Sequence, residues 1–198
     1  MLNSKFSHAC IFLATFFSLS CSLVKNESTE ILGEIDFNAT GKTEAQPAFK
    51  KGMLLVYSFE YEDAAEEFRN AINIDKDFAM AYWGEAMTQN HPLWRYQNYE
   101  KATDILNQLA PNPEERIAKA TTSMEKDLFK GIHILYGTGT KQERDSLFAL
   151  FMGTLHEKYP TNNEITSMYS LALIGSVPVG RNAEVYEQAA GLAKEVLK

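Results

Sequence analysis

The segment EYEDAAEEFRNAINIDKDFAMAYWGEAM, residues 60–87, decides the fold class. Its first half places Ala64 and Phe68 four residues apart, within a three-and-four spacing that puts side chains on one face of an α-helix. The polar turn DKDF at residues 75–78 interrupts this pattern, which starts again at Ala79. The segment therefore predicts two consecutive helices, each with one apolar face.

The same pattern extends over most of the chain. Segments with apolar residues at helical spacing follow one another from residue 44 to the C-terminus, and turns such as those at Pro111 and Gly137 separate them. Almost no segment has the alternation of a β-strand. The sequence predicts an all-α domain of antiparallel helical hairpins over residues 44–198.

Small and aromatic residues recur at fixed places in this pattern. The positions are Gly52, Ala64, Phe68 and Ala71 in the first hairpin, and Tyr82 and Ala86 at the start of the second. In this spacing the chain resembles the tetratricopeptide repeat family, whose repeat is about 34 residues long because two helices cross closely and stack on the next pair. The resemblance covers roughly residues 44–198 and implies an α-α superhelix, a solenoid with a concave groove.

A second resemblance is more specific. Residues 81–94 read AYWGEAMTQNHPLW, and the HPLW portion is an insertion relative to the repeat. This segment is similar to one shared by a group of exported bacterial tetratricopeptide proteins. Members of that group continue past the equivalent of Lys198, so the resemblance also implies that this chain is truncated at its C-terminus.

The resemblance places the first helix of each hairpin along the groove. The side chains expected to face it are Phe49, Met53, Tyr57, Met80, Trp83, Met87, Asn90 and His91. A groove rich in Met and aromatic groups suits an apolar peptide, since Met adapts its shape and Trp supplies a large contact area. The first hypothesis is therefore a protein-interaction module or scaffold. The alternative is that later helices pack into the groove and fill it.

Glu85 stands where the repeat normally has Leu. A half-buried carboxylate needs a partner or a raised pKa, and Gln89, His91 and Arg95 are the candidates. One interpretation makes Glu85 and His91 ligands of a small molecule or metal, walled by Trp83 and Trp94. The other makes Glu85 a structural hydrogen-bond acceptor that fixes the insertion loop. Two such ligands do not make a metal site, so we expect no metal.

Known catalytic patterns are missing. The sequence contains no GxSxG, HExxH, Cys–His pairing or phosphate-loop spacing. We therefore expect a binding protein without enzymatic activity or cofactor. The net charge is -7 and no Lys/Arg stripe follows any helix face, which argues against nucleic acid as a partner.

The N-terminus has a different character. Residues 1–20 combine Lys5, a short apolar run and small residues, as a secretory signal does, and Cys21 is a lipidation candidate. We expect export, to the periplasm or as a membrane-tethered lipoprotein, with residues 21–43 as a linker. Any contact with a membrane would be through this N-terminal lipid. The sequence has two Cys residues, and the other, Cys10, leaves with the signal, so the mature chain has no internal disulfide.

The last predicted helix presents an apolar face without a following helix to cover it. The residues expected on that face are Tyr186, Ala189, Ala190, Ala193, Val196 and Leu197. Repeat arrays need polar ends in water. This favours further chain after Lys198, a partner or a second copy as the cover.

Overall fold

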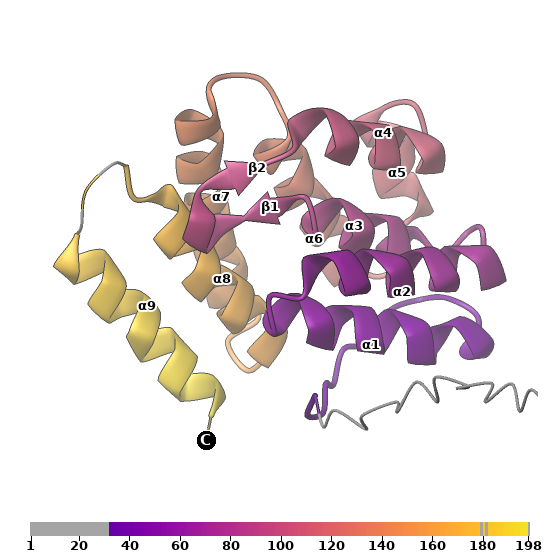
Figure 1. Ribbon diagram of the computed structural model, residues 1–198, viewed down its shortest axis with the longest axis horizontal. Coiled ribbons are helices and arrows are strands. Elements are labelled where there is room, and N and C mark those ends of the chain that lie inside the picture. Colours follow the sequence, from indigo (N-terminus) through magenta and orange to yellow (C-terminus); the bar gives the residue numbers. More distant parts are fainter. Residues whose placement is uncertain (1–31, 179, 181, 198) are drawn as a thin grey trace, which may run out of the picture. The chain divides into compact units, whose positions relative to one another are not determined.

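A computed structural model describes residues 32–178, 180 and 182–197 of the 198-residue chain. The predicted signal segment, residues 1–20, and the lipidation candidate Cys21 lie outside these residues. Nearly all of the described regular structure is α-helical, which confirms the all-α class (Figure 1). No helix in the described part of the chain combines the length and the apolar character needed to span a membrane.

The described residues form α-helices joined by short connections. The helices are α1 (Gln46–Tyr57), α2 (Tyr61–Ile74), α3 (Ala79–Met87), α4 (Tyr99–Leu109), α5 (Pro113–Lys119), α6 (Ser123–Leu135), α7 (Lys141–Lys158), α8 (Asn163–Ser176) and α9 (Ala183–Val196). Two 3-10 turns, η1 (Thr43–Ala45) and η2 (Pro92–Trp94), and two short strands, β1 (Asn90–His91) and β2 (Tyr96–Gln97), complete the described elements.

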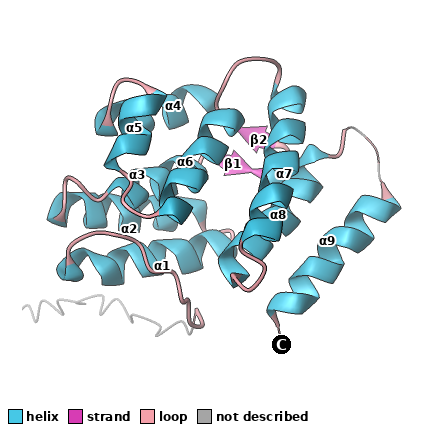
Figure 2. Ribbon diagram, turned by 180° about the vertical axis from the view of Figure 1, so that it is seen from behind, coloured by secondary structure: helices cyan, strands magenta, loops and turns pink. Residues whose placement is uncertain are grey.

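Helices that follow each other in sequence pack side by side. Contacts join α1 with α2, α2 with α3, and α3 with α4, and the same holds for the helices from α5 to α9 (Figure 2). Helices such as α2 and α4 have one buried apolar face and one exposed polar face, as the three-and-four spacing predicts, whereas α3 is buried on nearly every side.

Side-chain caps fix where several helices begin. Asn98, Asn112, Asn162 and Asn182 each accept a hydrogen bond from a backbone N–H in the first turn of the helix that follows. Thr122 with Glu125, and Thr140 with Glu143, form reciprocal capping boxes at α6 and α7. Each cap satisfies N–H groups that have no partner within the helix.

Two glycines allow three helices to meet at one ring. Phe68 of α2 is fully buried between α1 and α3. A Cβ atom at Gly52 would lie 2.9 Å from the Phe68 ring, and one at Gly84 would lie 2.4 Å from it. Both separations are shorter than normal contacts, so this crossing needs glycine on both helices.

Residues 32–42, within the predicted linker, have no regular secondary structure and pack on the helices. Phe37 is fully buried, and its ring lies 5.6 Å from that of Phe49. The Thr40 N–H donates to Glu125, and the Lys42 N–H donates to Asp75 at 2.8 Å. This part of the predicted linker therefore belongs to the helical domain.

Candidate functional site

Four of the predicted groove residues, Phe49, Met53, Met80 and Trp83, belong to the buried core, and Phe49 and Met80 are the most deeply buried of them. Phe49 and Met80 are fully buried, and the Phe49 ring lies within 5.8 Å of the rings of Phe37, Phe68 and Phe78. The expectation that Phe49 and Met80 line an accessible groove is corrected by this packing. The signal that placed them there, helical spacing, is the same for groove and core positions.

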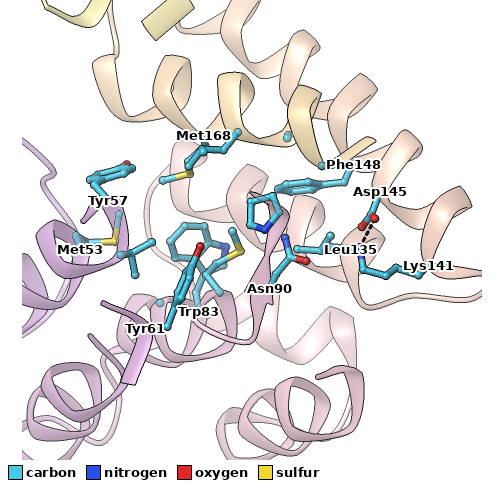
Figure 3. A pocket seen from close by; sticks show the side chains of 17 residues that line it. Met53, Tyr57, Tyr61, Trp83, Asn90, Leu135, Lys141, Asp145, Phe148 and Met168 are labelled. Atoms are coloured by element: carbon cyan, nitrogen blue, oxygen red, sulfur yellow. Dashed lines mark hydrogen bonds and ion pairs between the residues drawn. The ribbon is translucent and has the colours of Figure 1, made fainter. Parts of the chain in front are cut away.

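Most of the other predicted groove residues line one cavity. Met53 and Tyr57 come from α1, Trp83 and Met87 from α3, and Asn90 from β1. Residues of α8, including Met168 and Leu171, close the cavity from the opposite side (Figure 3). Later helices therefore occupy the space of the predicted groove and leave a cavity of about 50 Å³.

The cavity differs in chemistry between its two ends. In Figure 3, Met53 and Tyr57 lie at one end, and an ion pair between Lys141 and Asp145 lies at the other. Trp83 lies between them, and its indole N–H donates to the Leu128 carbonyl at 3.1 Å. Apolar groups dominate one end, and paired charges mark the other.

The Tyr57 hydroxyl is enclosed without a well-formed hydrogen bond. Burial raises the pKa of Tyr57 well above its ordinary value, and the nearby Glu164 carboxylate raises it further. Burial likewise raises the pKa of Glu164, with an added contribution from the negative charge of Asp36. Tyr57 and Glu164 are therefore both held in their neutral forms more strongly than in water.

Glu85 has a different partner from the three that the sequence suggests. Its carboxylate accepts from Arg69 of α2 at 3.1 Å, and only 8% of its side chain is exposed. Burial raises the pKa of Glu85, while Arg69 and Lys101 oppose the shift. Glu85 therefore joins α2 to α3, and the expectation of a partner among Gln89, His91 and Arg95 is corrected.

Those three candidates bond elsewhere. Gln89 donates to the Thr88 hydroxyl at 2.8 Å, and the His91 Nε2 lies 2.9 Å from the Thr88 carbonyl oxygen. Arg95 donates to the Gly180 carbonyl at 3.1 Å. Among the residues that the structure describes, no group of three or more His, Cys, Asp or Glu side chains is placed to hold a metal ion.

The insertion forms a small hairpin. In the antiparallel pairing of β1 and β2, Asn90 faces Gln97 and His91 faces Tyr96, with η2 between the strands. Gln97 accepts from Arg144 of α7 at 2.6 Å.

Arg144 attaches this hairpin to the main helices. Besides Gln97, it donates to the carbonyls of Leu135 and Gly139. Its guanidinium lies 4.8 Å from the centre of the Tyr99 ring. Since Arg144 is buried, these contacts hold the insertion in one position against α6 and α7.

An aromatic cluster lies where the hairpin meets the turn between α1 and α2. We define it by Phe59, Tyr61, His91, Trp94 and Tyr96. The rings of Tyr61 and His91 are stacked with centres 3.8 Å apart. Trp94 contacts Phe59, Tyr61 and His91 edge to face. Trp94 is 60% exposed and Tyr96 52%, so the cluster presents apolar rings to solvent.

Sequence reasoning found some of this site and missed the rest. His91, Trp94 and Arg95 were expected in the insertion, and Met53, Trp83 and Asn90 around a shared space. Phe59, Tyr61 and Tyr96 were missed, as were Lys141, Asp145 and Met168. Tyr96 follows the HPLW segment by two residues, so its position in the sequence was an available signal. Phe59 comes from the turn between α1 and α2 and Tyr61 from the start of α2, both far from the insertion in sequence, and only the fold brings them to it. Nothing local points to Lys141 or Asp145, because α7 reaches the cavity only through the tertiary fold.

No family model, curated protein or solved structure matches this chain. Its function is therefore inferred from the geometry of the site.

Proposed function

We propose that the helical hairpins of this chain are tetratricopeptide-like. The support is the crossing at Phe68, where Gly52, Ala64 and Ala71 occupy the small positions of the first repeat. Ala64, Phe68 and Ala71 are fully buried, as such a repeat requires. The corresponding contact in the second repeat comes from Gly84, two residues before the expected Ala86.

On this scaffold the chain is a non-enzymatic interaction module that binds a protein or peptide. The aromatic cluster is the contact surface, and the exposure of Trp94 and Tyr96 is the observation that carries the proposal. Exposed, contiguous aromatic side chains are unusual on a surface with no partner. Trp and Tyr are also the residues that most often dominate the binding energy of protein interfaces.

Backbone strain beside the cluster supports the same assignment. Phe59, with φ of 63°, and Arg95, with φ of 55°, are the non-glycine residues with positive φ in the described part of the chain. The left-handed region costs about 1–3 kcal/mol for such residues and persists where the surroundings impose it. Both residues orient aromatic rings of the cluster, so the strain maintains an exposed surface.

The partner that fits this surface presents an apolar side chain between the rings of Trp94 and Tyr96. This differs from the groove mode expected from the resemblance, in which Phe49, Met53 and Trp83 contact the peptide. A peptide in the groove would require α8 to move, whereas the aromatic cluster is accessible with every helix in place.

The test uses the chain as bait and compares variants. Proteins recovered from cells of the source organism are identified by mass spectrometry, and one recovered partner is then purified and titrated. We expect Trp94→Ala and Tyr96→Ala each to weaken its binding at least about tenfold, the scale of an interface hot spot.

Leu150→Ala is the matched control. Leu150 of α7 is 70% exposed, so the substitution removes a similarly accessible apolar group outside the cluster. The affinity of the Leu150→Ala protein for the partner should match that of the unmodified chain. Equal binding of the Trp94→Ala and Leu150→Ala proteins would rule out the aromatic cluster as the contact surface.

Export is a second part of the proposal. It rests on the order of charge, apolar run and small residues in residues 1–20, followed by Cys21. Mass spectrometry of chain produced in a bacterium tests it. We expect a product that begins at Cys21 and carries several acyl chains, which stable tethering requires. A product that retains residues 1–20 would contradict export.

A further inference from the structure

The cavity between α1, α3 and α8 offers a second binding site, which takes a different ligand from the exposed aromatic cluster. A single water needs a cavity of about 10–15 Å³, so a cavity of about 50 Å³ accommodates a group of several heavy atoms. Side chains that bind apolar groups line one end of the cavity, and a pair of oppositely charged side chains lines the other end.

Adaptable apolar side chains form the first end. Met53, Met87 and Met168 line the cavity together with Val56 and Trp83, and Met53 and Met168 lie away from the Lys141–Asp145 pair in Figure 3. Methionine is flexible and polarisable, so its side chains can close around aliphatic groups of varied shape. This end favours an unbranched or branched aliphatic side chain.

The second end combines an ammonium, a carboxylate and an amide. Lys141 pairs with Asp145, whose side chain is 7% exposed, while that of Lys141 is 31% exposed. Asn90 lies beside them, and Gln97 donates to its Oδ1 at 3.2 Å, which turns the NH₂ group of Asn90 away from Gln97. The end therefore offers donors for an anion and an acceptor for a cation.

The charge balance of this pair decides the class of ligand. A fatty acid would compete with Asp145 for Lys141 and leave one carboxylate without compensation. An amine would do the same to Lys141. The cost is greatest for Asp145, because its side chain is buried, whereas the partly exposed Lys141 loses its close partner but keeps contact with water. A zwitterion adds no net charge and pairs with both side chains.

We infer that the cavity binds a free apolar α-amino acid as its zwitterion. Its carboxylate accepts from Lys141 and the Asn90 amide, and its ammonium donates to Asp145. Its aliphatic side chain lies among Met53, Met87 and Met168, beside Trp83. Leucine, with a side chain of four carbons, is the representative ligand. This site is independent of the protein partner proposed above.

Trp83 gives a direct readout. The sequence has two tryptophans, Trp83 in the cavity wall and the exposed Trp94, so Trp94→Phe leaves Trp83 as the single indole. The full chain with this substitution is titrated with L-leucine. Parallel titrations use 4-methylpentanoate, which lacks the ammonium, isopentylamine, which lacks the carboxylate, and glycine, which lacks the side chain. We expect saturable change in Trp83 emission with leucine and at least about tenfold weaker binding of the other three probes.

Two variants test the two ends of the cavity. Asp145→Asn removes the partner of the ligand ammonium and should weaken leucine binding at least about tenfold. Ala172→Leu adds bulk to the α8 wall of the cavity without removing a charge and should also abolish binding. Ala190→Leu, which adds the same group at an exposed position of α9, is the control and should bind leucine normally. Circular dichroism and melting temperature establish that each variant is folded.

Three results would overturn the inference. The first is no saturable response of the folded Trp94→Phe protein to leucine up to about 10 mM. The second is binding of 4-methylpentanoate or isopentylamine as tight as that of leucine. The third is unchanged leucine affinity in folded Asp145→Asn or Ala172→Leu protein.

Discussion

At the scale of single residues, His133 of α6 makes the clearest prediction. Both of its ring nitrogens are enclosed without a hydrogen-bond partner, and its ring lies 6.0 Å from that of Phe129. Burial, with a smaller contribution from the Arg116 charge, lowers the pKa of His133 from 6.5 to about 4. The folded state therefore holds this ring neutral at pH values where the unfolded chain protonates it.

The free energy of unfolding should decrease as the pH falls, because of the imidazole ring of His133. Because the folded pKa lies below the unfolded one, the unfolded state binds more protons between pH 6.5 and about 4, and the free energy of unfolding decreases as the pH falls through that range. His133→Leu should remove this part of the pH dependence and gain on the order of 2 kcal/mol relative to the unmodified chain near pH 4.5. Urea unfolding of both proteins from pH 7 to 4.5 measures it. A difference in unfolding free energy between the two proteins that stays constant across that pH range would contradict the prediction.

Glu164 predicts a pH dependence of the opposite sign. Burial raises its pKa, so the folded state keeps its proton above the ordinary value of 4.5. The free energy of unfolding should therefore decrease as the pH rises from 4.5 through the raised pKa. Glu164→Gln stays neutral at every pH and can still face the Tyr57 hydroxyl. Its advantage over the unmodified chain in thermal unfolding should grow from pH 4.5 towards neutrality and then level off. An advantage that shrinks over that range would show that Glu164 is stabilised as the anion.

At the scale of elements, the crossing of α1, α2 and α3 tests how closely the helices must approach. Gly84→Ala would place a methyl group 2.4 Å from the Phe68 ring, whereas Gly191 of α9 has open space around it. Overpacking costs about 1–3 kcal/mol, and replacing Gly by Ala within a helix gains up to about 1 kcal/mol. Chemical denaturation should show Gly84→Ala destabilised and Gly191→Ala stabilised. Equal effects at both positions would mean that the contact with Phe68 does not limit the crossing.

Helices and their apolar faces were predictable from the sequence, because Ala64, Phe68 and the turn at residues 75–78 carry local signals. The hairpin of the insertion was not predictable from the sequence. Its two-residue strands depend on Arg144, which lies 47 residues beyond Gln97, and on no alternation in the strands themselves. Residues Phe59 and Arg95 adopt positive φ without being Gly or Asn, so no sequence rule marks them.

At the scale of the whole described domain, the sequence could not decide between an open and a filled groove. Met53, Trp83 and Met87 have the same residue types whether they meet a peptide or Met168 of α8. The outcome depends on how far the second half of the chain returns towards the first, which local periodicity does not encode. Of the apolar face expected on the last helix, Ala189 is buried, whereas Ala190 and Ala193 are exposed and Leu197 is 85% exposed. Leu192, which is not on the expected face, is buried beside Ala189, and α9 contacts α8.

Phe37 tests whether residues 32–42 contribute to the stability of the whole domain. Phe37→Ala empties a fully buried position beside Phe49, so we expect a loss of about 3–5 kcal/mol in the free energy of unfolding. Leu147→Ala, at a position that is 55% exposed, is the control and should cost less than about 1 kcal/mol. Urea denaturation followed by circular dichroism measures both. Similar losses for the two variants would mean that residues 32–42 separate from the helices before global unfolding.

The contact between Thr40 and Glu125 also constrains the order in which the chain assembles as it is made. The two residues are 85 positions apart, so Thr40 leaves the ribosome long before its acceptor exists. The hairpin of α1 and α2 needs only neighbouring sequence and can form early. Phe37 can already contact Phe49 of α1 at that stage, whereas the Thr40 N–H gains its acceptor only when α6 arrives. During synthesis this interval leaves residues 32–42 held only through α1 and α2, and their attachment to α6 follows once Glu125 has been made.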